Sequence, residues 1–128
     1  MVNASIKTFK DLLIWQRSSE RSLGIYRLTN RFPRHEFCGL KSELRKTSRS
    51  VFCNIAEGHR RESTIEYIRF LRISAGSAAE LESQILSANR LGYVQGNAAD
   101  QIPEKIAEIE RMLDSLIRSL KMKLSRAC

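Results

Sequence analysis

The chain has 128 residues, the size of one domain, and its net charge of +8 with an isoelectric point near 9.9 favours a polyanionic partner, nucleic acid ahead of a membrane surface. Its three cysteines include no CxxC pair, which argues against a disulfide framework or a zinc site and suits a reducing cytoplasm. No apolar run approaches the roughly 20 residues that a membrane-spanning helix needs. We therefore expect a cytoplasmic protein without a membrane partner.

The first predicted helix covers residues 10–31 and has two apolar sides. Helical spacing favours a core stripe of Leu12, Trp15, Ser19, Leu23 and Tyr26. A second stripe on the other side consists of Ile14, Ile25 and Leu28. The helix should end before Pro33, because the residue before a proline is pushed out of helical dihedral angles.

The second predicted helix, residues 38–57, has three different faces. Its core face consists of Leu40, Leu44, Thr47, Val51 and Ile55. Its opposite, solvent-facing side carries Lys41, Arg45, Lys46 and Arg49, with Phe52 among them. A polar strip beside the core consists of Ser50, Asn54 and Glu57. Gly58 is typical of the residue that follows a helix, after which the chain continues into Arg60 and Arg61.

The third predicted helix, residues 64–91, begins at a capping box of Ser63 and Glu66. Its core stripe consists of Tyr67, Leu71, Ser74, Ala78, Leu81 and Ile85. A second apolar edge consists of Ile68, Ala75, Ala79 and Leu86. Gly76 costs about 1 kcal/mol relative to alanine inside a helix, so we expect another helix backbone to lie close to it.

The fourth predicted helix, residues 101–125, has the most regular stripe of the chain, and residues 125–128 should fray. The stripe consists of Ile102, Ile106, Ile109, Leu113, Leu116 and Leu120. Four helices with short connections predict an all-α, up-down-up-down antiparallel four-helix bundle, one domain over residues 1–128. The second stripes predict self-association. The predicted oligomer contacts are Ile14, Ile25, Leu28, Phe52, Ile68, Ala75, Ala79 and Leu86.

Three segments resemble one known family: FKDLLIWQRS, FPRHEFCGLKSELRKTSRSVFCNIAEGHRR and FLRISAGSAAELESQI. This is the four-helix bundle protein family that includes the ribosomal-RNA intervening-sequence proteins. The accessory variability determinants of diversity-generating retroelements look like relatives of the same fold. The resemblance covers about residues 9–93, and the NIAEG segment indicates the fold rather than the function. It implies a bacterial or phage-derived cytosolic protein, a homopentameric ring or barrel and no known catalysis. For the retroelement relatives it implies binding of RNA and of a reverse transcriptase.

The basic residues are the best functional candidates, because Lys and Arg bind nucleic-acid phosphates without a fixed spacing. The predicted RNA or DNA contacts are Lys41, Arg45, Lys46, Arg49, Arg60, Arg61, Arg69 and Arg72. The alternatives are an ordinary solvated helix face, and a protein-interaction scaffold whose positive charge meets an acidic protein. For Phe52 an oligomer contact is favoured over stacking on a base.

The remaining polar residues favour structure over catalysis. Asn54 and Glu57 beside the core need partners, and the predicted network pairs Glu57 with an arginine and Asn54 with Ser77. The two histidines lie away from any carboxylate–nucleophile set, and the inward Glu-x-x-His pairs of a bundle metal site do not occur. We therefore expect a non-enzymatic protein that needs no metal and no cofactor.

Overall fold

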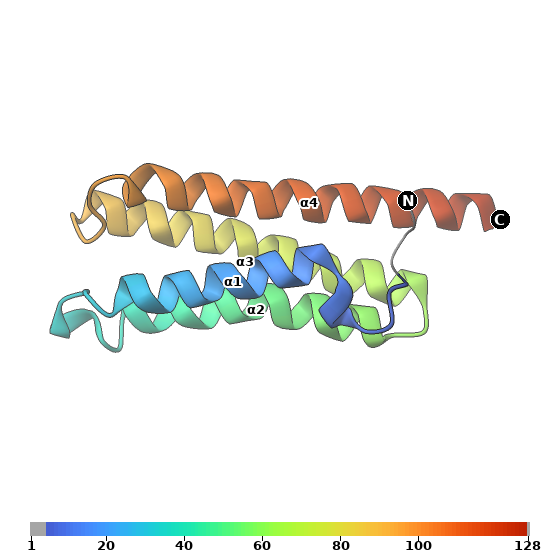
Figure 1. Ribbon diagram of the computed structural model, residues 1–128, viewed down its shortest axis with the longest axis horizontal. Helices are drawn as coiled ribbons and strands as arrows, with labels where there is room; N and C mark the ends of the chain where they lie inside the picture. The colour runs from blue at the N-terminus through green and yellow to red at the C-terminus, as the bar shows by residue number, and fades with distance from the viewer. Residues whose placement is uncertain (1–4, 128) are drawn as a thin grey trace.

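The computed structural model describes residues 5–127, and in this range the chain forms four long α-helices, two short 3-10 helices and no strand (Figure 1). The elements are η1 (Phe9–Asp11), α1 (Leu13–Thr29), η2 (Arg34–Glu36), α2 (Leu40–Arg60), α3 (Thr64–Arg90) and α4 (Ala98–Ala127). The prediction of an all-α chain with four helices is confirmed. None of the helices in this range is long and apolar enough to cross a bilayer.

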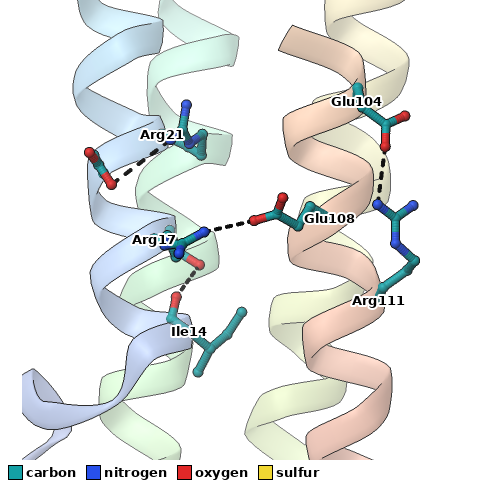
Figure 2. A network of polar contacts seen from close by, with 8 residues as sticks. Ile14, Arg17, Arg21, Glu104, Glu108 and Arg111 are labelled. Carbon is teal, nitrogen blue, oxygen red and sulfur yellow. Dashed lines mark hydrogen bonds and ion pairs between the residues drawn. The ribbon is translucent and has the colours of Figure 1, made fainter. Parts of the chain in front are cut away.

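Consecutive helices run in opposite directions along a common axis (Figure 1). Among the four pairs of neighbouring α-helices, α2–α3 makes the most contact, followed by α3–α4 and α1–α2, and α1–α4 makes the least. An ion pair of 2.9 Å between Arg17 of α1 and Glu108 of α4 bridges this looser seam (Figure 2). Beside it lies a groove of about 570 Å³ with Ile14, Met112 and Leu116 in its walls.

The first helix begins later than predicted because η1 forms a separate turn before it. The Thr8 side chain accepts a hydrogen bond from the backbone N–H of Lys10 at 3.2 Å, and the Asp11 carboxylate accepts one from the backbone N–H of Thr8 at 3.1 Å. This capping box stabilises the N-terminal end of η1, which spans Phe9–Asp11. The backbone at Leu12 is extended, so α1 begins only at Leu13.

Two other helix ends also differ from the prediction. Gly58 lies within α2, which continues to Arg60, so Gly58 is not the residue that releases the chain from the helix. The last helix begins at Ala98 and continues through Ala127, where we expected fraying from residue 125. Cys128 lies outside the described residues.

Two clusters of buried side chains form the core, one in each half of the bundle. One consists of Ile14, Val51, Ile55, Ile68, Leu71, Ala78, Ile109, Leu113 and Ile117. The other consists of Ile25, Phe32, Leu44, Leu81, Ile85, Ala88, Val94 and Ile106. All four helices contribute, so each amphipathic face is covered mainly by its neighbours.

The core face of α1 is rotated around the helix axis from the predicted one, although Leu12 and Trp15 of the predicted stripe still pack against the core. Its buried residues are Ile14, Ser18, Ser22, Ile25 and Thr29, whereas Leu23 of the predicted core stripe is 58% exposed. Ser18 and Thr29 each donate a hydrogen bond of 2.7 Å to the carbonyl four residues earlier, and Ser22 bonds Ser48 of α2 at 2.9 Å. Because these hydroxyls are satisfied, they can lie in the core without an energetic penalty for unpaired polar groups.

The predicted oligomer contacts consequently fall into three groups. Three of them, Ile14, Ile25 and Ile68, are buried in the core of the chain itself. These three residues therefore cannot contact another subunit in the way we predicted. Half-buried are Leu28, Phe52 and Ala75. Exposed are Ala79 and Leu86. The predicted core stripe of α3 is confirmed from Leu71 to Ile85, which explains why the exposed pair lies on the outer side of that helix.

Gly58 and Gly76 have opposite surroundings. A Cβ atom on Gly58 would lie 2.8 Å from Cβ of Phe70 and 3.2 Å from the carbonyl oxygen of Tyr67. A Cβ on Gly76 would meet nothing within 4 Å. The close approach of another helix that we expected at Gly76 therefore occurs, within the chain, at Gly58.

Tyr93, between α3 and α4, joins its loop to the one between α1 and α2. Its hydroxyl donates to Oε2 of Glu36 at 2.9 Å and lies 3.1 Å from Nε2 of His35. Since the hydroxyl has a single proton, Nε2 of His35 must be the donor in the second contact. The backbone N–H of Leu40 and then the Tyr93 hydroxyl lower the pKa of Glu36, which keeps this carboxylate ionised. We interpret this use of His35 as structural.

The two glycines give a matched stability test. Gly58→Ala should lower the free energy of unfolding by about 1–3 kcal/mol, because its methyl group would overpack against α3. Gly76→Ala should raise that free energy by up to about 1 kcal/mol, since alanine favours the helix and no atom obstructs its methyl group. Urea unfolding of both variants measures the difference, and equal midpoints would contradict the close contact at Gly58.

Candidate nucleic-acid interface

Arg45 lies against the C-terminal end of α1. Its Nε donates to Oγ1 of Thr29 at 2.8 Å, and its Nη2 donates to the carbonyl of Tyr26 at 3.0 Å and to Oδ1 of Asn30 at 2.8 Å. Its guanidinium also lies 4.5 Å from the centroid of the Tyr26 ring. A cation at the last carbonyls of a helix is stabilised by the helix dipole. The geometry therefore gives Arg45 a structural role, although the sequence predicts a phosphate contact.

The other cations of α2 are held less firmly. Arg49 donates a hydrogen bond to the Tyr26 hydroxyl, and the ammonium of Lys41 lies 5.1 Å from the centroid of the Phe37 ring. Lys46 is exposed, as is Arg49. An exposed cation–π contact contributes only about 0.5–1 kcal/mol. A phosphate could therefore compete for Lys41, Lys46 and Arg49.

Arg61 and Arg69 both lie against the ring of Phe70, where α2 turns into α3. Their guanidinium carbons are 4.8 Å and 4.5 Å from the ring centroid. Arg61 also pairs with Glu57 at 3.1 Å, and Arg69 donates to both oxygens of Glu66 at 3.0 and 3.1 Å. The hydrogen bond from Arg69 lowers the pKa of Glu66, so this ion pair persists at neutral pH. The four charges cancel, which leaves these two arginines little net attraction for phosphate.

The predicted polar network is present in a modified form. Asn54 donates to the carbonyl of Ser50 at 2.8 Å and to its hydroxyl at 3.1 Å. The Ser50 hydroxyl in turn bonds the Ser77 hydroxyl at 2.8 Å, so Asn54 reaches Ser77 through Ser50 rather than directly. Glu57 has an arginine partner, Arg61, but the pair is solvent-exposed. These contacts join α2 to α3 and to the following turn.

Phe52, the aromatic side chain among the cations of α2, contacts another ring of the chain. It is half-buried, and its ring lies edge-on to Trp15 with the two centroids 6.2 Å apart. Such aromatic pairs contribute about 0.5–1.5 kcal/mol beyond the area that they bury. This contact gives Phe52 a role in joining α1 to α2.

A further group of cations has no ion-pair partner within residues 5–127. These residues, which we call the end cluster, are Arg60, Arg72, Lys121, Lys123 and Arg126. The three on α4 were not among the predicted contacts. The composition of α4 could have indicated them. Residues 118–127 contain four Lys or Arg and no Asp or Glu, whereas residues 98–117 contain two Lys or Arg and five Asp or Glu.

The fold brings the end cluster to one end of the bundle. There α2 turns into α3, and the last part of α4 runs alongside and past this turn (Figure 1). A groove of about 340 Å³ separates α3 from α4 at this end, and its lining includes Arg72 and Lys121. Within the described residues, no three His, Cys, Asp or Glu side chains come together to hold a metal ion. With Arg72 and Lys121 in the lining of the groove, this end of the bundle has a cationic surface.

The sequence model of a family described as 23S rRNA-intervening sequence protein matches residues 10–115. The chain belongs to the 23S rRNA-intervening sequence protein family. Its fold is also similar to the crystal structure of a protein of unknown function from the S23 ribosomal protein family of Bacteroides thetaiotaomicron. That comparison has a TM-score of 0.76 and 22% sequence identity, and it covers 83% of this chain and 96% of the other. No curated protein matches the chain.

The family match confirms the resemblance to ribosomal-RNA intervening-sequence proteins. The solved structure, at its low identity, supports the shared fold. The resemblance to accessory proteins of diversity-generating retroelements stays a prediction.

Replacement of Arg45 tests its structural role in this family member. Arg45→Gln removes the charged donor from the end of α1 and should lower the free energy of unfolding by about 1–3 kcal/mol. Lys46→Gln, its exposed neighbour, should change stability by less than about 0.5 kcal/mol. Urea unfolding followed by circular dichroism measures both. Equal stability of the two variants would leave Arg45 as a surface cation available to phosphate.

Proposed function

We propose that the protein is a non-enzymatic, oligomeric accessory protein that binds nucleic acid, RNA in preference to DNA, in the cytoplasm. The observation that carries this proposal is the end cluster, in which exposed cations gather without carboxylate partners among the described residues. The description of the family, which refers to an intervening sequence of 23S rRNA, supports RNA as the partner. A reverse transcriptase as a further partner, which the retroelement resemblance implies, stays a prediction.

Phosphate binding depends on cations that are free to exchange their counterions. Arg45, Arg61 and Arg69 already donate to oxygen atoms of the chain, so a phosphate would have to displace those partners. A phosphate that binds Arg60 or Arg72 would have no such partner to displace among the described residues. We therefore place the main RNA contact at the end cluster rather than at Lys41, Lys46 and Arg49 of α2.

We also propose that copies of the chain assemble into a closed ring, for which we predict five subunits. Leu23, Ile73 and Leu86 are 58%, 42% and 46% exposed, which supports a further contact surface. The distribution of charge supports a head-to-tail arrangement. Residues 5–61 contain 13 Lys or Arg and five Asp or Glu, whereas residues 62–117 contain five Lys or Arg and nine Asp or Glu. The basic α1–α2 side of one copy thus complements the acidic α3–α4 side of the next. Head-to-tail contacts form rings when their rotation closes.

RNA binding is tested by its dependence on salt. The variant Lys121→Gln/Lys123→Gln/Arg126→Gln should lower the slope of log affinity against log salt by about 0.7 for each single-strand phosphate contact that is lost. The variant Lys41→Gln/Lys46→Gln/Arg49→Gln removes the same charge from α2 and should change the slope less. Fluorescence anisotropy with a labelled RNA measures both.

Equal slopes for the parent and both variants would place the RNA elsewhere. A parent that binds an acidic protein but no RNA would favour the alternative, a protein-interaction scaffold.

Self-association is tested by light scattering. The parent should have about five times the chain mass of 14.7 kDa. Leu86→Glu places a charge on the exposed side of α3 and should shift the mass towards that of a single chain. Leu91→Glu, at a residue that is 56% exposed beyond the end of α3, is the control and should keep the parent mass. A parent with the mass of one chain would contradict the ring.

A further inference from the structure

We propose that the groove between the start of α3 and the end of α4 receives one unpaired base of the bound RNA, with Arg72 and Lys121 on the adjoining phosphates. This inference rests on the proposed function and adds to it that the RNA is single-stranded where it meets the end of the bundle. It also identifies Ile65, rather than an aromatic residue, as the side chain against which the base packs.

The shape and lining of the groove suit one flat apolar group. Its volume of about 340 Å³ is at the lower end of the roughly 300–1,000 Å³ of small-molecule pockets. Its apolar walls are Ile65, Ile68 and Leu124. Ile68 is 7% exposed and belongs to the core, whereas Ile65 is 65% exposed. A planar ligand that covers Ile65 removes apolar surface from water, and this burial favours binding of the ligand.

The charges around the groove select an anionic ligand. Its other lining residues are Arg69, Arg72 and Lys121, and no carboxylate lines it. Arg69 is occupied by Glu66, whereas Arg72 and Lys121 have no ion-pair partner among the described residues. Arg72 comes from α3 and Lys121 from α4, so cations approach the apolar floor from two different helices. A nucleotide combines an apolar face with a phosphate on either side, which matches this arrangement.

Other anionic ligands fit less well. An acidic amphipathic helix binds through a row of anchors at i, i+3, i+4 and i+7, which extends over about 10 Å and fills several apolar sites. The groove offers a single site between α3 and α4. A base within an RNA duplex is stacked on both faces and paired, so it cannot enter. An unpaired base at a loop, bulge or end remains as the ligand that matches.

Two RNA strands of equal charge test the inference. One is a labelled oligouridine of about ten nucleotides, and the other has the same backbone without bases, so both offer the same phosphates. In fluorescence anisotropy the parent should bind the strand with bases about five-fold more tightly, which is the low end of the range for a base on an aromatic ring, because isoleucine offers apolar surface but no ring. The salt dependence of the two strands should be the same, since it reports phosphates only.

Ile65→Ser locates the effect. It should reduce the preference for the strand with bases to nearly one-fold and leave the salt slope unchanged. The control is Leu91→Ser, at a similarly exposed leucine at the opposite end of the bundle, which should keep the five-fold preference. A thermal melt of both variants checks that they fold like the parent, as expected for residues 65% and 56% exposed.

The outcomes separate this inference from the proposed function. A parent that binds both strands equally overturns the base site and leaves RNA binding intact. A parent that binds neither strand overturns both. If polyglutamate of matched charge displaces the labelled strand as well as unlabelled oligouridine does, the groove takes an acidic chain and the inference is wrong.

Discussion

The structure depends on the close approach of α2 and α3. A Cβ atom at Gly58 would lie only 2.8 Å from Cβ of Phe70, so α3 would have to shift to accommodate a side chain there. Further along, the Ser74 hydroxyl donates to the carbonyl of Val51 at 2.7 Å. Small and hydroxyl-bearing residues bring the two backbones together and also satisfy the polar groups that they bury. Gly58 and Asn54, in the segment from residue 54 to residue 58, thus contribute to the packing and hydrogen bonding of α2.

This approach also determines which cations remain free. The turn after Gly58 brings Arg61 and Arg69 to the same ring, that of Phe70, and each finds a carboxylate within its own helix or turn. Side chains that are paired in this way stabilise the chain locally and have little attraction left for a ligand. Arg60 and Arg72, one residue before and three residues after this pair of arginines, keep their charge available. Whether one of these arginines is free to bind a ligand therefore depends more on whether it has a carboxylate partner in the chain than on its position in the sequence.

The sequence was sufficient for the number of helices and for the core faces of α3 and α4, because isoleucine and leucine recur there at helical spacing. It failed on α1, because hydroxyl groups that bond their own helix can replace apolar side chains in the core, as at Ser18 and Thr29. The predicted site included Arg72 but missed Lys121. These two residues are 49 positions apart in the chain, and only the order of the helices brings them to one groove.

The distribution of charge also constrains how a polyanion such as the proposed RNA can approach. Burial raises the pKa of Glu110 on α4, and the charge of nearby Glu82 on α3 raises it further, so acidic groups are already crowded on this side of the bundle. A polyanion is repelled from that side and attracted to the end cluster. In a head-to-tail ring the acidic side of each copy would be covered by the basic side of the next. Cyclic symmetry places equivalent groups of all subunits on the same rim. The end clusters would then form one cationic rim, where several weak contacts to a single RNA strand add by avidity.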